Sequence, residues 1–180
     1  MEKKYKLTEE TLEIEGHVLN RIIALRDFGE VKKGDLGGFI EKESNLSHDW
    51  TCWIYNDAKV CGEAMVYGNA MVYGEATVCG NAEVYGEAMV CGNAEVYGNA
   101  MVYGNAKVCG NAKVEKKSDY IVFKNWWSSG RYFTWTRSND MWSVGCFYGT
   151  GEELIKKAYK NSEEKGREYA RIVKYVKSIK

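Results

Sequence analysis

An aliphatic residue returns at every sixth position through the middle of this chain, and no other feature limits the possible folds as strongly. From Val60 to Val108 each one is followed by Tyr or Cys, then Gly, then Asn or Glu, then Ala. A period of six fits neither the roughly 3.6-residue turn of a helix nor a long flat strand. It fits a short strand and a tight bend, repeated many times. The aliphatic positions are Ile54, Val60, Val66, Val72, Val78, Val84, Val90, Val96, Val102, Val108 and Val114.

The repeat predicts a three-sided solenoid. Alternation along each short strand turns the alanine and the aliphatic residue inward and the residue between them outward. The glycine of each bend, and to a lesser degree the asparagine, tolerates the positive φ that a sharp bend requires. Three sides of six residues close one coil, and neighbouring coils pair as parallel strands about 4.8 Å apart. The backbone hydrogen-bonding groups of each coil are then satisfied by the neighbouring coils.

The repeat can be followed upstream of Ile54, where its letters are less regular. We expect Leu36 to occupy the aliphatic slot, and Ile40, Leu46 and Cys52 to occupy the alanine slot. On this frame the solenoid begins at Leu36, and His48 falls in an inward aliphatic slot.

Residues 36–114 resemble the hexapeptide-repeat superfamily of left-handed parallel β-helices, which share the order of an aliphatic residue, two or three turn residues and a small residue. The resemblance implies left-handed coiling, which the period alone does not show. Many members of that superfamily are trimeric CoA-dependent acyltransferases in which a histidine at a subunit boundary acts as the general base. The order LGGF…NLS…VYGNA also resembles short bacterial and prophage proteins described as transferases.

We therefore predict a mainly β chain whose solenoid, a left-handed parallel β-helix, lies between two end structures. Residues 1–35 are expected to form an N-terminal β-hairpin cap, and residues 115–180 a small C-terminal α+β domain. The hairpin should turn at Glu15 and Gly16. Its expected core contacts are Leu12, Ile14, Leu19, Ile23 and Leu25.

The C-terminal domain is predicted to contain three strands and two helices. The strands are expected at 120–127, 132–137 and 141–147. Thr150 and Glu153 have the spacing of a capping box that opens a helix, and a second helix should begin near 161–164. The apolar stripe of this second helix is Tyr169, Ile172, Val173 and Val176.

Sorting the repeat by coils places like residues in columns along each side. Two sides display Met and Tyr, whereas the third carries Lys59, Thr77, Glu95 and Lys113. The Met and Tyr columns can stack between rungs, and they can also form a subunit or partner interface, so we expect a homo-oligomer, either dimer or trimer. The candidate interface residues are Met65, Met71, Met89, Met101, Tyr67, Tyr85 and Tyr103.

The columns also place Cys61 beside Cys79 and Cys91 beside Cys109. We expect free thiols, because in-register parallel neighbours rarely offer the torsion of a disulfide and because the N-terminal residues, with no apolar run behind their lysines, do not resemble an export signal. The spacing of the cysteines and histidines predicts no metal site and no cofactor. No apolar stretch approaches the roughly 20 residues of a membrane helix, and the expected location is the cytoplasm.

Catalysis is not expected from the two histidines. His17 precedes the solenoid and His48 lies in its least regular coil, so neither has the context of the acyltransferase base. The coils from Ile54 to Val114 contain no histidine and no inserted loop that would wall a substrate pocket. An acyltransferase remains the enzymatic alternative.

The C-terminal domain combines aromatic residues with positive charge. Such a mixture can stack bases and hold phosphates, it can recognise a protein, or its aromatic residues can simply pack on the helices and the last rung. The candidate face consists of Trp126, Trp127, Arg131, Trp135, Arg137 and Trp142.

The sequence thus favours a non-catalytic macromolecular interaction protein that self-associates through its Met/Tyr sides. The prophage resemblance implies a phage-encoded chain that acts on a host target, such as a defence protein. A nucleotide or nucleic-acid binder is a further alternative.

Overall fold

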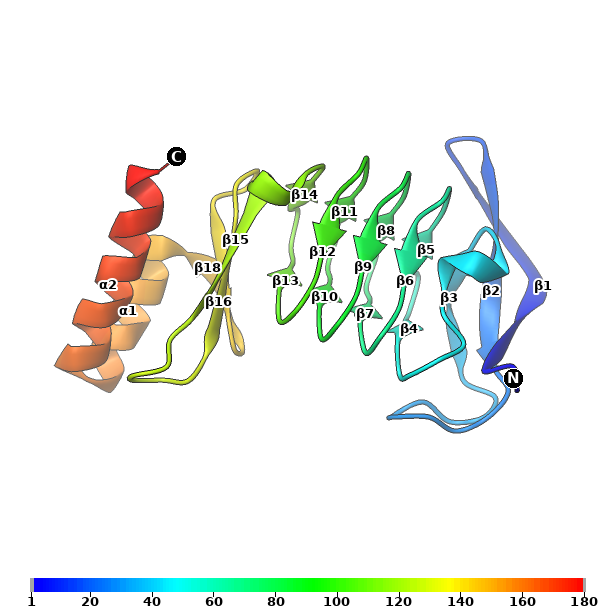
Figure 1. Cartoon of the computed structure of the whole chain (residues 1–180), viewed down its shortest axis with the longest axis horizontal. Helices are drawn as coiled ribbons and strands as arrows, with labels where there is room; N and C mark the ends of the chain where they lie inside the picture. Colours follow the sequence, from blue (N-terminus) through cyan, green and yellow to red (C-terminus); the bar gives the residue numbers. More distant parts are fainter. Residues whose placement is uncertain (1, 180) are drawn as a thin grey trace.

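The computed structural model describes residues 2–179, which form an elongated molecule with a solenoid at its centre. Figure 1 shows the N-terminal hairpin at one end of the solenoid, and an antiparallel sheet followed by two helices at the other. The prediction of a mainly β chain built on a parallel β-solenoid is confirmed.

The N-terminal end is an antiparallel hairpin of β1 (Tyr5–Ile14) and β2 (His17–Ala24), and β2 also pairs with β3 (Leu36–Ile40). The turn residues Glu15 and Gly16 both have positive φ, 50° and 84°, as a two-residue hairpin turn requires. Leu19 is buried together with Phe39.

On its second strand, the hairpin buries a pair of side chains other than the predicted Ile23 and Leu25. Ile22 and Ala24 enter the solenoid core, whereas Ile23 and Leu25 are only half-buried. Strand alternation explains the difference, because Ile22 and Ala24 share one face of β2 and Ile23 the other.

Eleven two-residue strands form the solenoid, and together with β3 they assemble into three stacks of parallel strands. The sheets have the orders β3-β5-β8-β11-β14, β4-β7-β10-β13 and β6-β9-β12. Val72 pairs with Val90, and Val90 with Val108, so the 18-residue coil is confirmed. The strands are β4 (Trp53–Ile54), β5 (Lys59–Val60), β6 (Met65–Val66), β7 (Met71–Val72), β8 (Thr77–Val78), β9 (Glu83–Val84), β10 (Met89–Val90), β11 (Glu95–Val96), β12 (Met101–Val102), β13 (Lys107–Val108) and β14 (Lys113–Val114).

The inward slots hold the predicted residues. Every repeat alanine from Ala58 to Ala112 and every repeat valine from Val60 to Val114 has a relative exposure of 0%. Backbone hydrogen bonds of uniform length join the coils, such as Met71 N–H to Ala88 O at 2.9 Å. Because these bonds pair the backbone N–H and C=O groups of neighbouring coils, the interior needs no polar side chains to satisfy them.

The frame predicted upstream of Ile54 is wrong by two residues. Ile40 pairs with Val60 and Leu46 with Val66, so both occupy the aliphatic slot rather than the alanine slot. Two additional residues therefore lie between Leu46 and Ile54, and this insertion contains His48. Leu36 is 58% exposed and fills no inward slot.

Gly38 stands where that coil needs its small residue. A Cβ on Gly38 would lie 2.4 Å from the carbonyl oxygen of Ala58. The first coil is therefore closed more tightly against its neighbour than the alanine slots allow elsewhere.

The cysteine columns are bonded, so the expectation of free thiols is wrong. Disulfides join Cys61 to Cys79 and Cys91 to Cys109. The parallel register brings the Cα atoms of the two pairs to 4.7 and 4.5 Å, within the span that a disulfide bridges.

The C-terminal domain contains four antiparallel strands instead of the predicted three. They are β15 (Tyr120–Lys124), β16 (Tyr132–Thr136), β17 (Met141–Val144) and β18 (Phe147–Thr150), paired in chain order. The predicted strand 141–147 is broken by a turn at Gly145, whose φ is 59°. The predicted strand 120–127 ends at Lys124.

The helices α1 (Gly151–Asn161) and α2 (Glu163–Ser178) pack on this sheet. The capping box is confirmed: Thr150 Oγ1 accepts from Glu153 N–H at 3.2 Å, and Glu153 accepts from Thr150 N–H at 2.8 Å. Of the predicted stripe, Tyr169, Val173 and Val176 are buried and Ile172 is partly buried.

Side chains of the C-terminal domain close the open edge of the last coil. Lys107 N–H donates to Thr134 Oγ1 at 2.9 Å, and Lys113 N–H donates to Ser138 Oγ at 2.7 Å. The Tyr120 hydroxyl donates to Met101 O at 2.9 Å. These bonds satisfy backbone groups that a naked strand edge would expose.

The corner glycines offer a test of the coil spacing. In Gly86→Ala the new Cβ would lie 3.0 Å from the Gly104 nitrogen of the next coil, and the residue has φ +73°. Gly104→Ala is the matched control, with φ +65° and nothing within 4 Å of its Cβ. We expect Gly104→Ala to lose about 1–2 kcal/mol of unfolding free energy from the left-handed backbone. Gly86→Ala should lose about 1–3 kcal/mol more from overpacking. Equal losses in denaturant unfolding would contradict this spacing.

Candidate functional site

The Met/Tyr sides form regular ladders along the solenoid. The rings of Tyr67 and Tyr85 stack with centroids 4.8 Å apart and planes 3° apart, and Tyr85 stacks on Tyr103 at 5.4 Å and 12°. Met65 is 42% exposed and Tyr103 46%, whereas the other candidates on these sides are half-buried. Stacking between rungs is therefore a property of the fold, and part of the ladder still faces solvent.

Glu83 interrupts the first Met/Tyr side, since it lies between Met65 and Met101 in their column. Its carboxylate accepts a hydrogen bond from the Tyr67 hydroxyl at 2.7 Å. Burial and this carboxylate raise the pKa of Tyr67, so its hydroxyl stays protonated as a donor. The Glu83 carboxylate on this side thus has a hydrogen-bond donor within the chain.

The second Met/Tyr side consists of the β4-β7-β10-β13 sheet. Met71 pairs with Met89, and Met89 with Lys107. Both methionines are half-buried, whereas Met65 on the first side is exposed.

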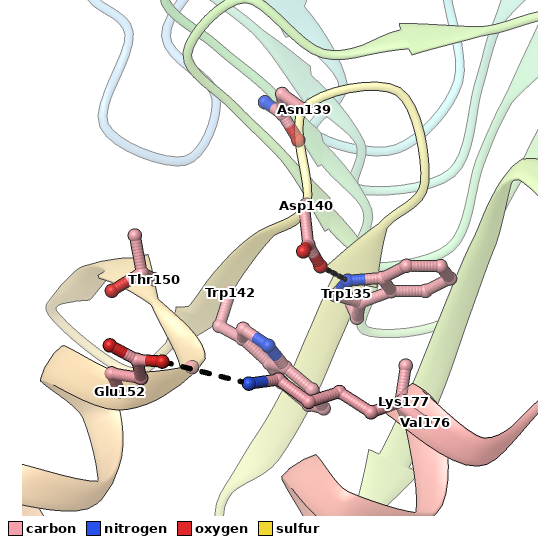
Figure 2. A pocket seen from close by; sticks show the side chains of 9 residues that line it. Trp135, Asn139, Asp140, Trp142, Thr150, Glu152, Val176 and Lys177 are labelled. Carbon is pink, nitrogen blue, oxygen red and sulfur yellow. Dashed lines mark hydrogen bonds and ion pairs between the residues drawn. The ribbon is translucent and has the colours of Figure 1, made fainter. Parts of the chain in front are cut away.

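The predicted aromatic face of the C-terminal domain does not form one surface. Trp135 and Trp142 are 1% and 2% exposed and pack between the sheet and the helices. Figure 2 shows Asp140 directed at the indole nitrogen of Trp135, a contact of 2.7 Å, and Lys177 reaching toward Glu152. The cavity between them measures about 280 Å³. These two tryptophans are core residues and cannot stack on a partner.

The other members of the predicted face stay exposed but are separated. Trp126 and Trp127 are 76% and 64% exposed in the β15–β16 loop, which also carries Arg131. Lys124 Nζ lies 5.0 Å from the Trp126 ring, and Trp127 Nε1 donates to Glu168 at 2.8 Å. Arg137 is exposed after β16 and donates to Ser118 O at 3.3 Å.

A groove that the sequence did not reveal lies between the hairpin turn and the charged side of the solenoid. Its volume is about 500 Å³. It could not be predicted because its first wall, Ile14 and Glu15, depends on where the hairpin lies against the coils. Its other lining residues are Cys61, Thr77, Cys79, Glu95, Val96, Tyr97 and Lys113.

His17 and Glu41 form a hydrogen-bonded pair at the margin of this groove. His17 Nδ1 lies 2.9 Å from Glu41 Oε2, and the same oxygen accepts from Gly62 N–H at 2.6 Å. His17 follows the groove-lining turn by two residues, and Gly62 follows the groove-lining Cys61. A carboxylate on Nδ1 leaves Nε2 free, which is the arrangement of an imidazole base.

The other histidine has a structural role. His48 Nδ1 accepts from Lys4 N–H at 3.1 Å, and its ring stacks on Tyr5 with centroids 4.4 Å apart. Burial lowers the pKa of His48, so the ring is neutral near pH 7.

Among residues 2–179, no group of three or more His, Cys, Asp or Glu side chains could hold a metal ion. No helix within the same residues is long and apolar enough to cross a membrane.

The His17–Glu41 pair makes stability depend on pH. The hydrogen bonds from His17 and Gly62 hold the pKa of Glu41 below its ordinary 4.5. Its contribution is therefore present above pH 4.5 and is lost as the pH falls through the lowered value. We expect Glu41→Gln to be less stable than the parent at pH 7, by up to about 1 kcal/mol. The gap should close in acid, and thermal unfolding at several pH values measures it. A gap that stays constant down to pH 3 would contradict the assignment.

Comparison with known proteins finds a match to the repeats of the solenoid. Residues 64–80 and 94–110 match the family model described as YdcK beta solenoid repeat. The uncharacterized acetyltransferase YdcK of Escherichia coli (strain K12) is 37% identical over an alignment of 62 residues that covers 30% of this chain and 19% of that protein. The chain therefore matches less than a fifth of that relative's length.

The matched segments are repeats that build coils, and neither His17 nor Glu41 lies within the residues of the family match. Together with the coil register, the matches fit a hexapeptide-repeat β-helix protein.

Proposed function

We propose that this chain is a non-catalytic interaction protein that self-associates, as a dimer or trimer, through the Met/Tyr sides of its solenoid. The observation that carries the proposal is the stacked ladder Tyr67–Tyr85–Tyr103, with Met65 and Tyr103 exposed along it.

Rigidity makes this ladder suited to binding. The tyrosines are held by stacking and by a backbone that is bonded to both neighbouring coils, so little conformational entropy remains to be lost on association. Tyr and Met are also enriched in protein interfaces.

The ends of the molecule leave further surface for another macromolecule. Trp126 and Trp127 are exposed in the β15–β16 loop of the C-terminal domain, where Lys124 Nζ lies 5.0 Å from the Trp126 ring. The same loop carries Arg131. We expect this surface to bind a protein. The prophage resemblance alone suggests which protein, namely a host target of a phage-encoded chain. Binding of a nucleotide or nucleic acid would have to use this loop, since Trp135 and Trp142 are buried.

Light scattering after size-exclusion chromatography tests self-association. We expect a dimer or trimer of the 20.5 kDa chain, and dissociation in the double variant Met65→Lys, Tyr103→Glu, because charges would be buried unpaired. Thr77→Lys on the charged side is the matched control and should leave the mass unchanged. A monomeric parent at high concentration would refute the proposal.

Acyl transfer is the second candidate, and the His17–Glu41 pair beside the groove favours it together with the name of the relative in Escherichia coli. In that role His17 Nε2 would take the proton of an acceptor hydroxyl or amine. The groove itself does not fit CoA. Glu15 and Glu95 would repel its phosphates, and the one lysine lining the groove, Lys113, is paired with Glu95 at 2.8 Å.

Calorimetry separates the two candidates. We expect no saturable heat from acetyl-CoA or CoA with the parent protein. The second proposal would replace the first if acetyl-CoA bound saturably and its acetyl group were transferred. That transfer should be abolished in His17→Gln and retained in Thr134→Ser, the control far from His17.

A further inference from the structure

We propose that Lys4 and Cys52 form a site of covalent oxidation, at which dioxygen links the lysine nitrogen to the cysteine sulfur through one oxygen atom. Lys4 Nζ lies 3.3 Å from Cys52 Sγ, and both residues have a relative exposure of 0%. This site depends on neither proposed function.

The two-residue insertion builds the site around the lysine. The Lys4 side chain passes the ring of Phe28, whose centroid is 5.0 Å from Nζ, and enters the first coil. There Nζ donates to the carbonyl oxygens of Cys52 at 2.8 Å and Asp49 at 3.4 Å. The thiol of Cys52 is held by the carbonyl oxygens of Ser47 and Asp49, at 3.5 and 3.6 Å. Nitrogen and sulfur are therefore fixed against each other.

The identity of Cys52 is not required by packing. It occupies the alanine slot one coil below Ala70, since Trp53 and Ile54 pair with Met71 and Val72. Alanine fills that slot in the later coils. The sulfur at this position is thus the feature that brings a reactive atom to the lysine.

The identity of Lys4 is equally unusual for its place. It is the one fully buried lysine among residues 2–179, and its side-chain partners are carbonyl groups and a thiol rather than a carboxylate. Burial of a cation without a carboxylate is costly. Burial accordingly lowers the pKa of Lys4, which increases the share of neutral, nucleophilic amine.

The reaction balances with dioxygen as the oxidant. The O–O bond breaks, and one oxygen forms an N–O bond to Lys4 and an S–O bond to Cys52. One amine hydrogen and the thiol hydrogen leave with the other oxygen as water. Nitrogen and sulfur each give up two electrons, and dioxygen accepts all four. The small apolar oxidant can reach a buried site that excludes larger reagents.

The link would join the start of the chain to the first coil. The two disulfides join neighbouring coils between Cys61 and Cys109, so neither disulfide holds the N-terminal strand. An oxygen-dependent link between positions 4 and 52 would hold the hairpin on the end of the solenoid in the same way that a disulfide restrains an unfolded chain.

Peptide mapping by mass spectrometry tests the proposal on the full chain. Protein prepared without oxygen and then exposed to air should yield a cross-linked peptide that contains residues 4 and 52. Its mass should equal the sum of the two peptides plus one oxygen and minus two hydrogens, and dithiothreitol should release both. Air should also raise the thermal unfolding midpoint of the parent.

Two variants serve as controls. Cys52→Ala restores the residue of the repeat, and Lys4→Met keeps the length of the side chain without its amine. Each should fold, lose the cross-link and lose the air-dependent shift of the midpoint. The proposal is overturned by any of three results in the parent: an oxygenated Cys52 without a link, an N–S link without oxygen, or two unmodified peptides after prolonged exposure to air.

Discussion

The parallel hydrogen-bond ladder between coils is the constraint on which the rest of this structure depends. Each bond, such as Asn81 N–H to Gly98 O at 2.8 Å, fixes a residue directly below the one that follows it by a full coil. The same spacing leaves a backbone atom only 3.0–3.1 Å from the position of a Cβ at the corners from Gly62 to Gly92, and these corners also have positive φ, so both conditions favour glycine. Inside, the regular coils are filled by alanine beside valine, each with a relative exposure of 0%.

Because the register is fixed, a residue type that repeats every 18 positions forms a continuous column along one side of the solenoid. A tyrosine repeated in successive coils becomes a stack, and a repeated cysteine becomes a disulfide. Opposite charges repeated in succession become an ion pair, as in Glu95 and Lys113 at 2.8 Å. Asparagines in successive coils hydrogen-bond to each other, as in Asn81 and Asn99 at 3.2 Å. The solenoid therefore offers long, uniform surfaces, which suit association better than a reaction that needs several different groups at one point.

The sequence predicted the regular part well because a strict period leaves one register available. It failed where a residue fits two slots. Ile40 and Leu46 are apolar and can occupy either inward position, and the insertion near His48 carries no apolar marker that would reveal a shift of two. The turn at Gly145 was hidden because the residues on both sides of it favour strands.

The two tryptophans misplaced on a binding face show a different limit. All of Phe133, Thr134, Trp135 and Thr136 are buried, because helices cover one face of β16 and the last coil covers the other. Alternation along a strand tells which residues share a face, but it does not tell that both faces are covered. The candidate site at His17 was missed for a related reason, since its partner Glu41 comes from another element and its groove exists only between two elements.

The distribution of unusual chemistry follows from the same ladder. Within the repeat, any reactive side chain must have a neighbour of compatible size one coil away, and variation is limited to the outward positions. At the ends this requirement is lifted, because the next layer is a hairpin or an antiparallel sheet with its own sequence. The His17–Glu41 pair, the buried Lys4–Cys52 contact and the exposed Trp126 all lie there. In a chain of this design the coils set distances and surfaces, and the ends are where individual residues can carry specific chemistry.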